Sequence, residues 1–175
     1  MKKDGNYKFY SCTKNDLDRQ TATLILSALC GFHGELTSII KYSRYTLVCE
    51  EKDEKEMAKV FSEMAKAETE HLVLLARFVY KLGEEPISYM CRSIERNNSV
   101  FDNIKGIFTI EKMIIDAIAN EILSIKEYEK IIIRSKNEKA KEIVDSIILD
   151  ERNHLNKLRE LATRYKVKIF NAIDS

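Results

Sequence analysis

The chain has 175 residues, 45% of them hydrophobic and 33% charged, which is enough for one domain with a substantial core. One proline and five glycines in this length are typical of an all-α soluble protein. The net charge of +1 provides no basic field, so we expect neither nucleic acid nor an anionic membrane as a partner. We expect no signal peptide, and no uninterrupted apolar stretch approaches the roughly 18 to 20 residues of a membrane span. The four cysteines have no C-x-x-C spacing, which excludes a metal module built on paired cysteines and indicates reduced thiols in the cytoplasm.

The first half of the chain predicts two long helices. Residues 1–16 are polar and show no period, which indicates a flexible N-terminal arm. From Asp18 to Val48 apolar residues recur every three or four positions, which predicts one helix with a core-facing stripe of Ile25, Ala28, Phe32, Ile39 and Tyr42. Asp53 and Glu56 then have the spacing of a capping box, which predicts the start of a second helix. That helix is expected to end at Gly83.

The second half predicts another pair of helices. The pattern after the second helix is weak, with one short helix expected near Ser99. A third helix is predicted over about 109–133 and a fourth over about 139–166, with a C-terminal tail at 167–175. The turn within each pair is short, whereas about 25 residues separate the pairs, so we expect two antiparallel hairpins joined by a long crossover. The expected architecture is an all-α four-helix bundle over residues 17–166, as in ferritin-like folds.

A set of glutamates and histidines repeats in the two hairpins. In each hairpin a lone glutamate precedes a Glu-x-x-His pair, by 33 residues in the first hairpin and by 30 in the second. An i,i+3 spacing puts both side chains of a pair on one face of a helix, and all of these residues lie in register with the apolar stripes. The predicted ligands are Glu35, Glu68, His71, Glu121, Glu151 and His154. Four carboxylates and two imidazoles therefore point toward one interior region.

This set predicts a site for two divalent metal ions. A buried carboxylate without a partner is costly, and four of them would also repel one another, whereas two divalent cations would balance their charge. Mixed oxygen and imidazole ligation suits iron or manganese better than zinc. A single Glu-x-x-His pair would be weak support, since a core histidine is often only hydrogen-bonded, but all six residues agree in face, order and interval. The remaining histidine, His33, falls on the outer side of the first helix and is assigned no role.

Three further residues are predicted to support the ligands. Tyr42 and Tyr128 lie two turns beyond Glu35 and Glu121, still on the inner face, where each hydroxyl can bond a ligand carboxylate from a neighbouring helix. The alternative is a core tyrosine bonded to backbone or water. Asp150 is predicted to accept the free N–H of His71 across the bundle, the alternative being a solvated surface aspartate.

The first hairpin carries motifs of a known family. The chain reads Phe32-x-Gly34-Glu35, then Tyr42, then Phe61-x-x-x-Ala65-x-x-Glu68-x-Glu70-His71. These motifs resemble the rubrerythrin branch of the ferritin-like superfamily, over roughly residues 20–165. The resemblance implies a di-iron bundle that reduces hydrogen peroxide to water, often as a homodimer, with the six residues above as metal ligands.

Two departures from that family affect the expected function. Rubrerythrins usually carry a second glutamate one turn after the ligand of the third helix, where this chain has Ser124, and they commonly append an electron-donating rubredoxin domain, whose cysteines are absent here. We therefore expect a di-iron oxidoreductase that reduces hydrogen peroxide or O2 with electrons from a separate donor protein. Because the ligand set is also similar to that of manganese catalase and of bacterioferritin ferroxidase centres, three alternatives stay open: a dimanganese catalase, an iron-handling protein, and a bundle with a purely structural site.

Overall fold

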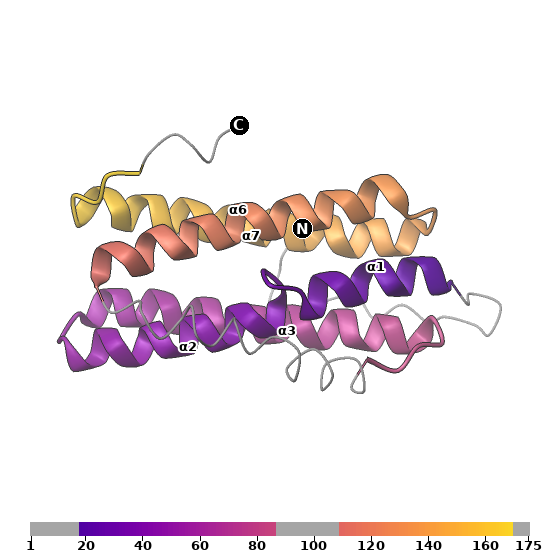
Figure 1. Ribbon diagram of the computed structural model, residues 1–175, viewed down its shortest axis with the longest axis horizontal. Helices are drawn as coiled ribbons and strands as arrows, with labels where there is room; N and C mark the ends of the chain where they lie inside the picture. The colour runs from indigo at the N-terminus through magenta and orange to yellow at the C-terminus, as the bar shows by residue number, and fades with distance from the viewer. Residues whose placement is uncertain (1–17, 87–108, 170–175) are drawn as a thin grey trace.

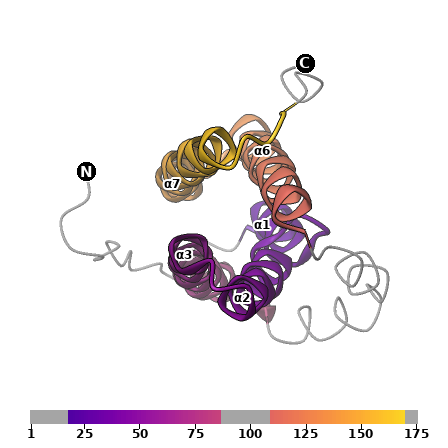
Figure 2. The same cartoon turned by 90° about the vertical axis from the view of Figure 1, so that its left-hand side faces the viewer.

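The protein is a helical bundle in the computed structural model, which describes residues 18–86 and 109–169 (Figure 1). The long helices within these ranges are α1 (Arg19–Cys30), α2 (Glu35–Glu51), α3 (Lys55–Lys81), α6 (Ile110–Arg134) and α7 (Glu138–Arg164). Helices α2 and α3 form one antiparallel hairpin and α6 and α7 form the other, and the end-on view shows the two hairpins facing each other (Figure 2). The predicted four-helix bundle of ferritin-like type is confirmed. The predicted arm at 1–16, the short helix near Ser99 and the end of the tail lie outside the described residues.

The first helix position differs from the prediction, because it is occupied by two helices in succession. The break between α1 and α2 lies at Gly31–Gly34, where both glycines have extended backbone and the N–H of Gly31 bonds the carbonyl of Ser27. A Cβ on Gly34 would lie 2.2 Å from the carbonyl oxygen of Ala28, so only glycine fits there. The break makes Glu35 the first residue of α2 and turns Phe32, expected in the core, outward to 40% exposure.

The other helix ends follow local side-chain chemistry. Thr109 and Asn137 cap α6 and α7 by accepting the N–H of the residue three positions on, close to the predicted starts. Gly83 follows α3 with φ 91°, as predicted for a helix stop. The predicted capping box is wrong: Asp53 is exposed with φ 58° in the turn between α2 and α3, so it is not placed to accept from the first turn of α3.

The core is divided into two apolar clusters along the bundle axis. One cluster joins α1 to the second halves of α3 and α6 and the first half of α7, and contains Leu29, Leu75 and Ile147. The other joins α2 to the first halves of α3 and α6 and the second half of α7, and contains Phe61 and Leu158. The residues predicted as metal ligands lie between these clusters in the sequence of every helix. Packed aliphatic and aromatic side chains therefore flank a buried polar region on both sides.

The first helix position, formed by α1 and α2, has a high mean hydropathy. The stretch Arg19–Glu51 contains an 18-residue window of mean hydropathy 1.4, long and apolar enough by composition to cross a membrane. Half of that window is buried inside the bundle, and the stretch is interrupted by the break at Gly31–Gly34. Packing of α1 and α2 against α3 and α6 explains the apolar character of these helices.

Candidate metal centre

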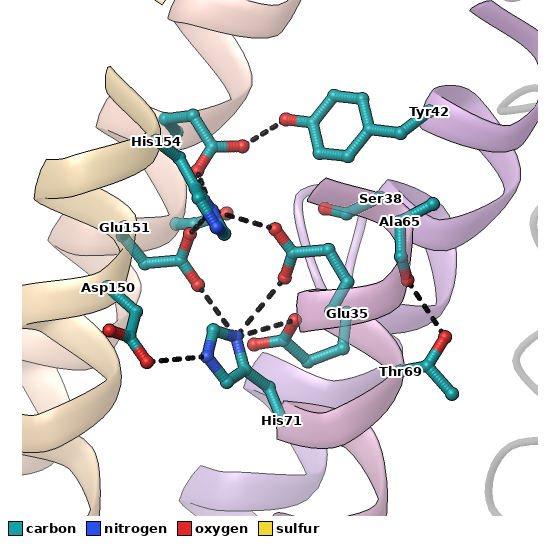
Figure 3. Close-up of polar contacts among 12 residues, drawn as sticks. Glu35, Ser38, Tyr42, Ala65, Thr69, His71, Asp150, Glu151 and His154 are labelled. Carbon is teal, nitrogen blue, oxygen red and sulfur yellow. Dashed lines mark hydrogen bonds and ion pairs between the residues drawn. The ribbon is translucent and has the colours of Figure 1, made fainter. Parts of the chain in front are cut away.

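All of the predicted ligands lie together in the middle of the bundle. Helix α2 supplies Glu35, α3 supplies Glu68 and His71, α6 supplies Glu121, and α7 supplies Glu151 and His154. None of these six side chains belongs to a residue more than 6% exposed. Figure 3 shows four of them, Glu35, His71, Glu151 and His154, converging from opposite sides of the bundle. The helical spacing of i,i+3 within α3 and α7 is what lets a carboxylate and an imidazole leave the same face.

One group of potential ligands surrounds the imidazole of His71. Its Nδ1 lies 3.2 Å from Glu151 Oε1 and 3.4 Å from Glu68 Oε2. The same nitrogen lies 3.8 Å from Oε2 of Glu35. One ligand atom from each of these four residues can be chosen such that all lie within 4.8 Å of one another. These distances are suited to one cation enclosed by three carboxylates and an imidazole.

A second group surrounds His154 and reuses two of the carboxylates. Its Nδ1 lies 3.2 Å from Glu151 Oε2 and 3.4 Å from Glu68 Oε1. Glu121, whose Oε2 lies 3.4 Å from the same nitrogen, completes this group. Opposite oxygens of Glu68 and Glu151 thus face the two histidines, whose rings are 6.2 Å apart. Among the described residues, Glu68 and Glu151 are shared by both groups, which is the arrangement of carboxylates that bridge two metals.

The donor chemistry of these residues fits two divalent cations. Glu68 Oε1, Glu121 Oε2 and Glu151 Oε1 are buried and, within the described part of the chain, accept no hydrogen bond. A buried carboxylate oxygen without a donor is strongly destabilising, and the carboxylates would repel one another as well. Four carboxylates and two neutral imidazoles would balance two divalent charges. The predicted dimetal site therefore agrees with the structure.

Burial and the contacts among these groups shift their pKa values away from the usual ranges. Burial raises the pKa of both Glu35 and Glu121 well above the usual range of a carboxyl group. Burial also opposes ionisation of Glu151, but the close contacts of its two oxygens with the two histidines outweigh burial and lower the pKa of that carboxyl. Burial disfavours the charged form of His154 too, yet its carboxylate neighbours raise the pKa to about 12. Cations that bind here must displace protons from the same atoms.

Asp150 makes the contact that was predicted for it. It is buried on α7, and its Oδ2 lies 3.4 Å from Nε2 of His71 (Figure 3). Nδ1 of the same ring faces the glutamates, so the carboxylate on the far side holds the imidazole with Nδ1 directed into the site. In α3 the position that corresponds to Asp150 is Ala67, so His154 has no equivalent aspartate.

The two tyrosines differ from each other. Tyr42, which is fully buried, donates its hydroxyl to Oε1 of Glu121 across the bundle, as predicted (Figure 3). Tyr128 is buried as well, but its hydroxyl has no hydrogen-bond partner among the residues that the structure describes. The predicted bond between Tyr128 and a ligand carboxylate is therefore not formed, since its ring packs in the aliphatic cluster of α1, α3 and α7.

The contacts of several polar residues around the site were not predicted from the sequence. Ser124, at the place of the second rubrerythrin glutamate, donates its hydroxyl to the carbonyl of His33 at 2.7 Å and so attaches the break between α1 and α2 to α6. His33, assigned no role, is half-buried with Nδ1 3.3 Å from Oδ1 of Asn120. Lys41 is buried beside the same amide. A signal was present, because Lys41 and Asn120 directly precede Tyr42 and Glu121 in the sequence.

The fold and the site together define a ferritin-like protein with a candidate dimetal site, in which two carboxylates are shared by both ligand groups. The family model for rubrerythrin matches residues 29–162, which includes all six candidate ligands, and the chain belongs to the rubrerythrin family. No curated protein and no solved structure matches the chain.

Proposed function

We propose that the protein is a di-iron oxidoreductase that reduces hydrogen peroxide, or O2, with electrons from a separate donor protein. The observation that carries the proposal is the pair of overlapping ligand groups that share Glu68 and Glu151. Two iron ions held this way would together supply the two electrons that reduction of one O–O bond requires. The reaction converts one hydrogen peroxide, two electrons and two protons into two waters. Membership of the rubrerythrin family supports this activity over other dimetal chemistry.

The surrounding residues are suited to this chemistry. The apolar clusters above and below the ligands keep bulk water from the site, which strengthens the electrostatic interactions inside it. Asp150 orients His71, and Tyr42 donates to Glu121. Each histidine must be neutral to serve as a ligand, so the protons that His71 and His154 hold without cations leave when the metals bind.

The electrons have to come from another protein in this proposal. Apart from the two overlapping ligand groups, no cluster of metal-binding side chains occurs in residues 18–86 and 109–169, and the four cysteines of the chain lack the paired spacing of a rubredoxin. We further propose that the protein works in the cytoplasm as a homodimer. Sedimentation of the loaded protein tests the dimer directly.

The central test is peroxide turnover by protein loaded with Fe²⁺ under anaerobic conditions, with and without an added reductant. We expect a rapid change in the absorption spectrum on addition of peroxide, sustained peroxide consumption only with reductant, and no release of O2. Release of O2 without reductant would instead indicate a catalase, and the same assay on Mn²⁺-loaded protein examines that alternative. A spectrum unchanged by peroxide would indicate a structural metal site, and a large hollow particle in light scattering would indicate iron storage.

A further inference from the structure

A network of polar side chains fills the interface between α2 and α6 next to the metal centre. We call Ser38, Lys41, Tyr42, Asp116 and Asn120 the α2–α6 polar network. Tyr42 is its end at the metal centre, and Asp116, whose side chain is 26% exposed, is its end toward solvent. Apart from Tyr42, none of these residues belongs to the predicted site, and none of the five is in either ligand group.

Lys41 is the charged member of the network. It is only 4% exposed, and a buried ammonium is stable only with close acceptors. Its Nζ lies 3.1 Å from Oδ2 of Asp116 and donates at 3.2 Å to Oδ1 of Asn120. An ammonium group can only donate hydrogen bonds, so it requires the oxygen of the Asn120 amide to face it. Lys41 therefore favours this orientation of the amide, and Nδ1 of His33 lies 3.3 Å from the same oxygen.

The orientation of the amide decides where the hydroxyl hydrogen of Tyr42 points. With its oxygen toward Lys41, Asn120 presents Nδ2 to Ser38 Oγ at 2.8 Å and to the hydroxyl oxygen of Tyr42 at 3.3 Å. An amide nitrogen is a donor only, so Tyr42 accepts from it and has its own hydrogen left for another acceptor. That acceptor is Oε1 of Glu121.

The hydrogen bond from Tyr42 determines which oxygen of Glu121 is available in the second ligand group. Because Oε1 of Glu121 accepts from Tyr42, Oε2 is the oxygen left without a hydrogen bond, and it lies 3.4 Å from Nδ1 of His154. We propose that Lys41 and Asn120 are positioning residues, which act through Tyr42 to hold Glu121 with one oxygen available to the metal beside His154. The inference extends the proposed function and rests on its dimetal site, but not on the identity of the oxidant.

Tyr128 provides a comparison with Tyr42, because it lies at the corresponding position of the second hairpin. Tyr128 occupies the corresponding place on α6, and its hydroxyl has no hydrogen-bond partner in the described part of the molecule. Within residues 18–86 and 109–169, Tyr128 therefore does not do for Glu35 what Tyr42 does for Glu121. Tyr128→Phe is the control, because it removes the same atom as Tyr42→Phe and breaks no hydrogen bond seen among the described residues.

The test is a double-mutant cycle on metal binding, with Co²⁺ as the probe and its visible absorption as a second readout. Asn120→Asp keeps the size of the side chain but replaces the donor to Tyr42 by an acceptor, which competes with Glu121 for the hydroxyl hydrogen. We expect Asn120→Asp and Tyr42→Phe each to weaken binding of one of the two Co²⁺ ions by roughly 10- to 100-fold and to alter the Co²⁺ spectrum. The double variant should be no weaker than the more severe single variant, because both changes remove the same bond.

One control and one further variant make the result specific. Tyr128→Phe should leave both Co²⁺ affinities unchanged, and Lys41→Met should reproduce part of the effect of Asn120→Asp. Losses that add up in the double variant, or unchanged affinities in both single variants, would overturn the inference. If wild-type protein binds two Co²⁺ ions but the iron-loaded form does not turn over peroxide, the proposed function fails while the cycle still decides this inference. Wild-type protein that binds fewer than two ions per chain would overturn both.

Discussion

The shared carboxylates make a quantitative prediction about metal stoichiometry. Glu151 belongs to both ligand groups, whereas Glu121 belongs only to the group around His154. Glu151→Ala should therefore abolish binding of both metal ions, and Glu121→Ala should abolish only one. Both variants remove a buried carboxylate. They differ in whether that carboxylate belongs to both ligand groups or to one.

The size of the effect follows from ligand linkage. Free metal at 100 times the dissociation constant stabilises the folded state by about 2.7 kcal/mol for each bound ion, so two independent ions contribute about 5.4 kcal/mol. For a chain of this length about 1 kcal/mol shifts the melting temperature by roughly 2 to 4 °C, which gives about 11 to 22 °C for wild-type protein. Glu121→Ala should retain about half of that shift, roughly 5 to 11 °C, and Glu151→Ala almost none.

The assay is differential scanning fluorimetry with Mn²⁺, joined to elemental analysis of the dialysed protein. Each variant is compared with its own metal-free form, since removal of a buried carboxylate also changes the stability of the protein without metal. Retention of one ion per chain by Glu151→Ala would refute the bridging arrangement. Two ions retained by Glu121→Ala would remove that residue from the ligand set.

Three other predictions concern protons, backbone and the support of one histidine. Because the ligand histidines and two of the glutamates have raised pKa values, cations must displace protons, so metal affinity should fall as the pH is lowered; calorimetry in buffers of different ionisation enthalpy should show net proton release. Gly34→Ala places a Cβ 2.2 Å from the carbonyl oxygen of Ala28, so it should destabilise the fold by about 1 to 3 kcal/mol in urea denaturation and weaken binding of the ion beside Glu35. Asp150→Asn should lower affinity for one ion by roughly 10- to 100-fold in a Co²⁺ titration, and an unchanged affinity would show that its contact with His71 has no role in binding.

Much of the bundle was predictable because apolar and ligand residues recur in the sequence with the period of a helix. The i,i+3 spacing within α3 and α7 determines which side chains share a face, and the caps Thr109 and Asn137 act over three residues. The convergence of the ligands was predictable for the same reason, since a buried carboxylate in an apolar stripe needs a partner. These features depend on short-range chemistry, which the sequence displays directly.

The features that were missed depend on contacts between distant segments. The break at Gly31–Gly34 follows from close approach of the chain to the carbonyls of the preceding turn, while the apolar period continues through it. The role of Asn120 appears only when α6 lies beside α2, because its partners are about 80 residues away in the chain. Tertiary pairing, rather than local propensity, decides such positions.

The duplication of the hairpin explains both the success and the failure of the prediction for the tyrosines. Equal spacing in the two halves predicts that Tyr42 and Tyr128 have equal roles, and only Tyr42 forms the expected bond. The ligands are matched because each half has to supply charge to a shared pair of cations, so a loss in either half leaves buried charge unbalanced. The surrounding residues are under no such constraint: Asp150 supports a histidine of one group, while Asn120 supports, through Tyr42, the carboxylate of the other. The two metal positions therefore have similar ligands but different polar surroundings, which is a physical basis for unequal properties of the two ions.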